Sequence, residues 1–237
     1  MTDWSDLPQM GQSDWHNRWG GRRWRHDATG IYIDNKTTPE RTPGEPETMR
    51  AILRLMEAPL KRACVEFWIP AELVLMTIAT ETAAYRRQGF TGPATFRWEN
   101  HVKVKDVSPP DVGDYSAGPM QMLAIVARER IRRDNLPVAP PFDFAPHFRD
   151  QPNIPPDDLP FYGYRGHLTV GAAELADRMQ RIGSDDPILN AARWNAGSLR
   201  ETRRNPWHIF THGNHLDRAA RWYGDACAVL SGLRNGA

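Results

Sequence analysis

The sequence predicts a mainly helical domain. Apolar residues recur at helical spacing along most of the chain, whereas a strand-like run is confined to residues 30–33. The chain has 237 residues, of which 40% are hydrophobic and 25% are charged, so it can bury a substantial core. We therefore expect one folded unit that is built mostly from helices.

The N-terminal segment, residues 1–45, differs from the rest of the chain in composition. It is polar, rich in Trp and interrupted by Gly and Pro. We expect it to wrap the domain that residues 46–237 form. Its run Arg22-Arg23-Trp24-Arg25 could contact nucleic acid by charge and stacking, but a packed arm with Trp buried and Arg at the rim is favoured.

The remaining chain contains a series of helical patterns and one stretch that interrupts them. The patterns cover residues 47–67, with a disturbance at Pro59, and residues 70–85, 120–133, 168–182, 187–194 and 214–230. Residues 136–164 are dense in Pro and aromatic residues and cannot form a regular helix. We expect this Pro-rich insertion to pack on the domain and to border a groove, because long loops are seldom without a role.

Glu81 is the first candidate functional residue. The segment before it is apolar on nearly all sides, which is typical of a buried core helix. A carboxyl group that is carried toward the interior loses hydration, which raises its pKa toward the range of a general acid near neutral pH. The alternative is a solvated Glu on an exposed helix end, where most Glu residues lie.

Two later segments contain groups that a sugar-binding site needs. In Ser116-Ala117-Gly118-Pro119-Met120-Gln121-Met122, the Gly lets backbone approach a ligand and the Gln offers a donor and an acceptor. A helix start with Ser116 as its cap and Pro119 in its first turn is the alternative. In Arg193-Trp194-Asn195-Ala196-Gly197, the Trp can stack on a sugar face, although the segment alone indicates only a helix end.

In this order, the three segments resemble the lysozyme-like lytic transglycosylases. In that family a catalytic Glu, a Gly-x-Met-Gln turn and an aromatic-Asn-Ala-Gly turn line one groove, and here they correspond to Glu81, Gly118-Pro119-Met120-Gln121 and Trp194-Asn195-Ala196-Gly197. The flanking segments 24–32, 41–46 and 205–218 are similar to a bacterial and phage subfamily. The resemblance spans about residues 19–230 and implies a single lysozyme-like catalytic domain.

The chain departs from the family pattern at three positions. Thr82 stands where Ser is usual, Pro119 where Leu is usual, and Trp194 where Tyr is common. Trp194 can stack on a sugar but lacks the phenol hydroxyl. Tyr223 on the last predicted helix could supply that hydroxyl, although a core aromatic is the alternative.

The resemblance implies a reaction and a set of binding residues. Glu81 protonates the glycosidic oxygen between N-acetylmuramic acid and N-acetylglucosamine. As a carboxylate, it then helps the muramoyl C6 hydroxyl attack C1, which forms a 1,6-anhydro ring. The residues implied in substrate binding are Ser116, Gly118, Met120, Gln121, Trp194 and Asn195, together with Arg97 and Glu99 from an Arg-aromatic-Glu element of some relatives.

Two other functions remain open. A muramidase of the same fold would hydrolyse the bond with a second carboxylate. The candidates for that carboxylate are Glu99, Asp106, Asp111 and Asp114. The fold could also serve as a non-catalytic peptidoglycan-binding or phage structural module, although the presence of Glu81 argues against this.

We expect neither a cofactor nor a bound metal ion. His208, His212 and His215 could approach one another, but no acidic residue completes an evident zinc site. Cys64 and Cys227 are too few for a disulfide framework and lack metal-ligand spacing, so buried free thiols are expected.

The charge and the apolar runs limit the partners. The formal net charge of +1 gives no global field to attract nucleic acid, and no apolar run approaches the length of a bilayer helix. We expect a monomer that binds peptidoglycan glycan strands and has no nucleic-acid partner or membrane segment. Residues 1–12 lack the features of a secretory signal. The expected route is synthesis in the cytoplasm and action in the periplasm or cell wall after release past a holin, in a virion or by a secretion system.

Overall fold

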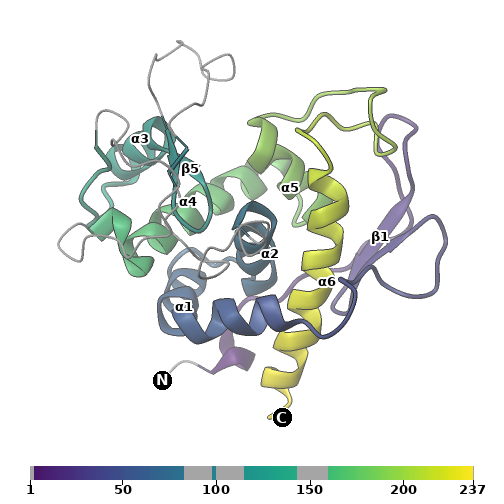
Figure 1. The fold of residues 1–237 in the computed structure, drawn as a ribbon, viewed down its shortest axis with the longest axis horizontal. Helices are drawn as coiled ribbons and strands as arrows, with labels where there is room; N and C mark the ends of the chain where they lie inside the picture. Colours follow the sequence, from purple (N-terminus) through teal and green to yellow (C-terminus); the bar gives the residue numbers. More distant parts are fainter. Residues whose placement is uncertain (1–2, 83–97, 100–114, 143–159, 237) are drawn as a thin grey trace.

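The computed structural model describes residues 3–82, 98–99, 115–142 and 160–236, and it is mainly helical there, as predicted (Figure 1). The helices are α1 (Glu47–Glu66), α2 (Ala71–Thr82), α3 (Ala124–Asp134), α4 (Tyr164–Ile182), α5 (Pro187–Ala196) and α6 (His215–Arg234), with short 3-10 turns η1 (Trp4–Asp6) and η4 (Pro160–Tyr162). The strands are β1 (Trp24–Asp27), β2 (Gly30–Ile33), β3 (Trp98–Glu99), β4 (Ser116–Ala117) and β5 (Met122–Leu123).

Helix α2 lies at the centre of the helical core because it has no polar face. Every residue of α2 except Glu81 is buried, and the helix packs against α1, α5 and α6. Its buried threonine hydroxyls donate to backbone carbonyls one turn earlier, at 2.6–2.8 Å, so they carry no unmet polar group into the core. The buried carboxylate of Glu72 forms an ion pair with Arg234 of α6.

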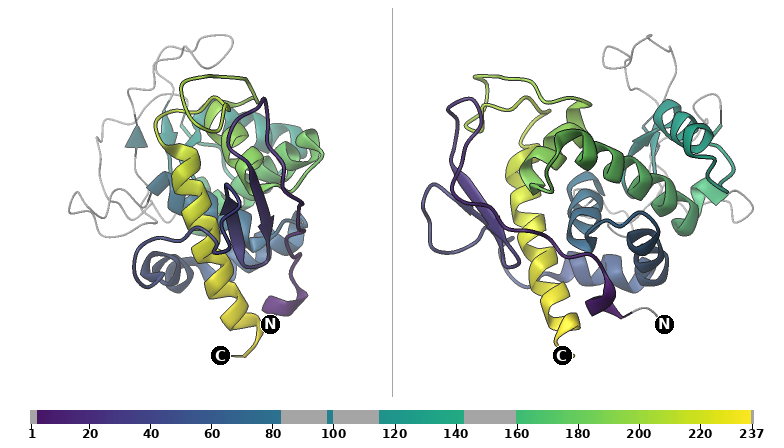
Figure 2. Two further views of the ribbon diagram at one scale, coloured as in Figure 1. Left: turned by 90° about the vertical axis from the view of Figure 1, so that its right-hand side faces the viewer. Right: turned by 180° about the vertical axis from the view of Figure 1, so that it is seen from behind.

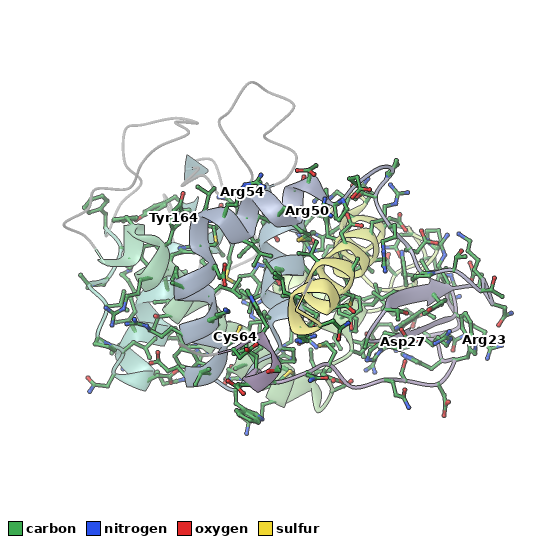
Figure 3. The ribbon with its side chains drawn as sticks, turned by 90° about the horizontal axis from the view of Figure 1, so that it is seen from below. Arg23, Asp27, Arg50, Arg54, Cys64 and Tyr164 are labelled. Atoms are coloured by element: carbon green, nitrogen blue, oxygen red, sulfur yellow. The ribbon has the colours of Figure 1, made fainter. Side chains whose placement is uncertain are left out.

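Helix α1 is amphipathic and bent. In Figure 3, Arg50 and Arg54 lie along the outer side of the helix, whereas Cys64 lies among the packed side chains. Met56 has a non-helical backbone (φ −142°), and Pro59 follows within the same helix. Since Pro59 has no N–H to donate to the preceding turn, the helix bends here. The disturbance predicted at Pro59 is confirmed.

The N-terminal segment runs along α6 and ends in a hairpin (Figure 2). The strand predicted at residues 30–33 is confirmed as β2, which pairs antiparallel with β1 so that Trp24 faces Ile33 and Asp27 faces Gly30. Both η1 and β2 pack against α6. Trp24 is fully buried, which agrees with a packed arm.

A closed group of polar side chains, which we term the Asp186 cluster, fastens this arm to α5. Asp186 caps α5 by accepting from the Leu189 N–H at 2.9 Å. Its other oxygen accepts from Trp24 Nε1 at 2.8 Å and lies 3.1 Å from His16 Nε2, and His26 is adjacent. Burial alone would raise the pKa of Asp186, but the hydrogen bonds from these neighbours hold that pKa below its ordinary value.

The start of α3 differs from the sequence prediction. We expected a helix from residue 120, but β4 and β5 form a hairpin whose turn contains residues 118–121, and α3 begins only at Ala124. Ser116 is a strand residue rather than a helix cap, and Pro119 lies in the turn. β3 adds a third strand, with Glu99 opposite Ser116. Strands of two residues are too short to show a period of two in sequence.

The two described ends of the Pro-rich insertion pack together. The Tyr115 and Tyr162 hydroxyls lie 2.7 Å apart, and the Phe142 N–H donates to the Tyr162 hydroxyl at 2.8 Å. The predicted packing of residues 143–159 lies outside the described residues. Cys64 and Cys227 are buried free thiols, as expected. Within the described ranges, no helix is both long and apolar enough to span a bilayer.

Candidate active site

A cavity of about 220 Å³ lies where α2, the β4–β5 hairpin, α3, α4 and α5 meet. Its lining residues are Glu81, Ser116, Gln121, Met122, Leu123, Val126, Glu174, Arg178, Trp194, Asn195 and His212. Each of the three segments singled out in the sequence contributes to this wall, although the segments are separated by at least 34 residues along the chain. We call it the Glu81 cavity.

Glu81 reaches the cavity from the last turn of α2. It is the only residue of this helix that is not buried, and its side chain is partly exposed on the cavity wall. Because the rest of α2 is fixed within the core, the helix holds the carboxyl group on a rigid support. The alternative of a fully solvated Glu does not describe this position.

The β4–β5 turn brings Gln121 to the wall of the same cavity. Gly118 has φ +80°, and a Cβ at this position would lie 2.3 Å from His167 Cε1, so only Gly fits. Gln121 has φ +49°, which is uncommon for a residue with a side chain. Its backbone N–H and its side-chain amide both donate to the Gly118 carbonyl, at 3.0 and 2.8 Å. Ser116 Oγ donates to the Gln121 amide oxygen at 3.3 Å.

The turn rests on a buried histidine. His167 Nε2 accepts from the Met120 N–H at 3.1 Å, and burial lowers the pKa of His167 to about 3. The imidazole is therefore neutral at ordinary pH and can act as an acceptor. The Met120 side chain is fully buried against Gly171, where a Cβ would lie 2.3 Å from its sulfur. Met120 therefore supports the turn from beneath and does not line the cavity.

Trp194 and Asn195, at the end of α5, complete the wall. The indole N–H of Trp194 donates to the Met120 carbonyl at 3.2 Å, which links this residue to the β4–β5 turn. The Asn195 side-chain oxygen accepts from the His212 N–H at 2.7 Å and fixes the loop before α6. Gly197 ends α5 with φ +72°, as the predicted helix end requires.

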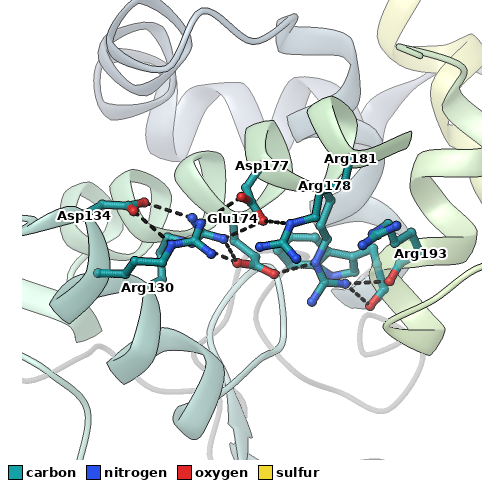
Figure 4. A network of polar contacts seen from close by, with 9 residues as sticks. Arg130, Asp134, Glu174, Asp177, Arg178, Arg181 and Arg193 are labelled. Carbon is teal, nitrogen blue, oxygen red and sulfur yellow. Dashed lines mark hydrogen bonds and ion pairs between the residues drawn. The ribbon is translucent and has the colours of Figure 1, made fainter. Parts of the chain in front are cut away.

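Sequence reasoning missed two charged residues of the wall, Glu174 and Arg178. Both oxygens of Glu174 accept from guanidinium groups: Oε2 from Arg130 at 2.6 and 2.9 Å, and Oε1 from Arg178 at 2.6 Å (Figure 4). Arg178 also donates to the carbonyls of Arg193 and Trp194, at 2.6 and 3.0 Å, and its guanidinium lies 5.0 Å from the Trp194 ring centre. The available signal was an acid–base pair four residues apart on a predicted helix.

The proposed binding role of Tyr223 does not agree with its position. Tyr223 is fully buried, does not line the Glu81 cavity, and donates its hydroxyl to the Asp27 carbonyl at 3.2 Å. Burial raises the pKa of this phenol. The residue lies on the face of α6 that packs on the hairpin, so it cannot supply the hydroxyl that Trp194 lacks.

Several candidate residues cannot be placed in the site. Arg97, Asp106, Asp111 and Asp114 lie outside the described residues. For Glu99 the backbone is described, as part of β3 beside Ser116, but the side chain is not. In the described part of the chain, no cluster of His, Cys, Asp or Glu is arranged to hold a metal ion.

The comparisons with known proteins do not assign the chain to a family. No protein-family model, no curated protein and no solved structure matches it.

Proposed function

We propose that this protein is a peptidoglycan lytic transglycosylase that uses Glu81 as its general acid and then as its base. The observation that carries the proposal is the convergence of Glu81, Gln121, Trp194 and Asn195 on one cavity. Each of these residues comes from a segment chosen for its likeness to the lysozyme-like transglycosylases. These four residues come from three segments that lie far apart along the chain.

Of the two glutamates that line the cavity, Glu81 is the better proton donor. Both oxygens of Glu174 are already acceptors for Arg130 and Arg178, so that carboxylate is part of the scaffold. Glu81 extends from the last turn of a buried apolar helix and lines the cavity. A positioned carboxyl group of this kind contributes roughly 10²–10⁴-fold by general acid–base catalysis.

The proposed reaction needs only this one carboxyl group. Glu81 gives its proton to the glycosidic oxygen as the bond from that oxygen to muramoyl C1 breaks. The muramoyl C6 hydroxyl then attacks C1, and its proton passes to the Glu81 carboxylate. The new C1–O6 bond closes a 1,6-anhydro ring, the acid is regenerated, and no water is consumed.

The other wall residues fit the binding of a sugar. An indole presents an apolar face on which a pyranose ring can stack, and Trp194 is held in place by Met120 and Arg178. Gln121 lies in the wall with a strained backbone, a feature that is concentrated at binding and catalytic sites. Asn195 fixes the His212 loop at the edge of the same cavity.

Mass spectrometry of the fragments released from purified peptidoglycan tests the proposal. The wild-type protein should release fragments with 1,6-anhydromuramoyl ends, and Glu81→Gln should release none while still binding the glycan. Glu66→Gln, the same change at an exposed position near the end of α1, is the matched control and should leave release unchanged.

The other outcomes identify the alternatives. Reducing muramoyl ends would mean hydrolysis and would direct the search for a second carboxylate to Glu99, Asp106, Asp111 and Asp114. Failure of freshly purified wild-type protein to release any fragment, with glycan binding unaffected by Glu81→Gln, would identify a binding module.

A further inference from the structure

A second cavity, of about 190 Å³, opens beside the Glu81 cavity and shares Val126, Glu174 and Arg178 with it. We call it the arginine pocket, because five arginines from α3, α4 and α5 line it: Arg130, Arg133, Arg178, Arg181 and Arg193 (Figure 4). The two cavities are therefore adjacent, and a substrate in the Glu81 cavity would lie close to the pocket.

The positive charges of the pocket exceed the negative ones. Its lining contains five guanidinium groups and three carboxylates, those of Glu129, Glu174 and Asp177. Asp134 beside the pocket forms ion pairs with Arg130 and Arg133, so five positive charges face four negative ones. Asp177 is shared among Arg130, Arg133 and Arg181, with contacts of 2.8–2.9 Å to each. The ion pairs of the wall therefore leave an excess of positive charge.

Arg193 differs from the other arginines of the pocket in its hydrogen bonding. Its Nε is buried and has no hydrogen-bond partner among the described residues. Burial, and then the positive charges of Arg178 and Arg181, lower the pKa of the Arg193 guanidinium. A partly buried cation beside two others is unfavourable unless an anion joins them.

We propose that the arginine pocket binds a carboxylate of the peptide stem that is attached to the muramic acid next to the cleaved bond. This inference rests on the proposed function for the identity of the substrate. The pocket is small, and guanidinium groups match the planar geometry of a carboxylate. The glycan sugars themselves bear no other ionised group, so the stem is the source of negative charge in this substrate.

Kinetics on two substrates test the pocket. Wild-type protein and Arg193→Gln are compared on soluble peptide-bearing glycan and on the same glycan with its stem carboxylates converted to amides, because removal of the stems would expose the lactyl carboxylate of each muramic acid. Loss of a charge-assisted contact should raise KM about tenfold on the peptide-bearing glycan. KM on the amidated glycan and kcat on both should not change. Arg54→Gln, at an exposed position on α1, is the matched control.

Two other results would contradict the proposal. A change of KM that is equal on the two substrates, or no change on either, would overturn the assignment of a stem carboxylate to this pocket. Arg193→Lys keeps the charge but not the planar fork, so its KM on peptide-bearing glycan should lie between those of the wild type and Arg193→Gln.

Binding measurements separate this inference from the proposed function, because they require no cleavage. Calorimetric titration of wild-type protein with the tripeptide L-Ala-γ-D-Glu-meso-diaminopimelate should show binding that weakens with salt, whereas its fully amidated form should not bind. Binding of the tripeptide without glycan cleavage would support the pocket and reject the transglycosylase. Cleavage without tripeptide binding, or equal binding of inorganic phosphate, would reject the peptide-stem pocket.

Discussion

The Glu81 cavity and the Asp186 cluster contain the same kinds of side chain in opposite environments. Each combines a carboxyl group, an indole and an imidazole. Asp186 is buried, and its two oxygens accept from the Leu189 N–H and the Trp24 indole. Glu81 lines an open cavity, and the indole there donates to a backbone carbonyl instead.

The difference shows that residue type does not define a site. In the Asp186 cluster both oxygens of the buried carboxylate accept from neighbouring donors, although His26 Nε2 is buried without a hydrogen-bond partner among the described residues. In the Glu81 cavity the indole and amide groups are fixed by the backbone, so that they present rings and edges to a hollow space. The first arrangement joins two parts of the fold, and the second places polar and aromatic side chains around a cavity.

Loss of the carboxylate should therefore have opposite consequences in the two regions. Asp186→Ala leaves the Trp24 indole and the α5 N-terminus without their buried acceptor, which should cost about 3–5 kcal/mol of unfolding free energy. The fraction that remains folded should keep its wild-type activity. Glu81→Gln should lose activity by roughly 10²–10⁴-fold and change the unfolding free energy by less than about 0.5 kcal/mol.

Urea denaturation and glycan-release assays on both variants measure the two effects. An Asp186→Ala protein as stable as wild type would mean that the closed cluster does not fasten the arm. Unfolding of Glu81→Gln would mean that Glu81 is a structural residue.

The free energy of unfolding should also fall at a different pH for each of the two regions. Burial lowers the pKa of His167, beneath the β4–β5 turn, to about 3. His215 at the start of α6 is lowered to about 3 as well, by burial and by Arg218. In the unfolded chain each histidine has its ordinary pKa of about 6.5, so the unfolded state takes up a proton at a higher pH than the folded state does. The stability from each neutral histidine is therefore complete above about pH 6.5 and is lost as the pH falls toward 3.

Between pH 7 and pH 5 the expected loss is about 2 kcal/mol for each of these histidines. Asp186 has a lowered pKa, so its contribution is lost only as the pH falls below about 4. Denaturation curves at pH 7, 6 and 5 test this order, with His167→Gln as the variant that should lose part of the dependence. A flat profile over this range in the wild type would contradict it.

The turn that supports the Glu81 cavity should tolerate no side chain at Gly118. Gly118→Ala places a Cβ at φ +80° and 2.3 Å from the His167 ring, so the turn or the imidazole must move. We expect a loss of about 2–3 kcal/mol in stability and a lower kcat, since the displaced turn carries Gln121. Gly183→Ala, at φ +70° with open space around it, is the control for backbone strain alone. Thermal unfolding and glycan release give the comparison, and equal effects at the two positions would argue against a role for the His167 contact.

The helical part of the fold could be predicted from sequence, but the small sheet could not. Period and apolarity identified α2 as a buried helix, and Pro59 marked the bend in α1. The β4–β5 hairpin was missed because its strands have two residues each and an apolar run follows them directly. Local pattern cannot separate such a hairpin from the first turn of a helix.

The candidate site could also be predicted only in part. Glu81, Gln121 and Trp194 were chosen from the order of three segments, and they line one cavity. Glu174 and Arg178 were missed because an ion pair on a helix indicates its exposed face equally well. Tyr223 was wrongly placed in the site. Its hydroxyl is buried against the Asp27 carbonyl of a hairpin almost 200 residues away, and local sequence cannot show such a contact.

The smallest expected effects are those of removing one indole from each region, Trp194 from the Glu81 cavity and Trp24 from the Asp186 cluster. Trp194→Phe keeps an aromatic face in the Glu81 cavity and removes only the hydrogen bond to the Met120 carbonyl, so stability should fall by about 1 kcal/mol and KM should rise a few-fold. Trp24→Phe removes a fully buried donor to Asp186, whose charge then loses a partner, and should cost two to three times as much stability without changing KM. Equilibrium unfolding and glycan-release kinetics on this pair measure both quantities. If Trp194→Phe lowered stability as much as Trp24→Phe and left KM unchanged, the indole of the cavity would be a structural group like that of the cluster.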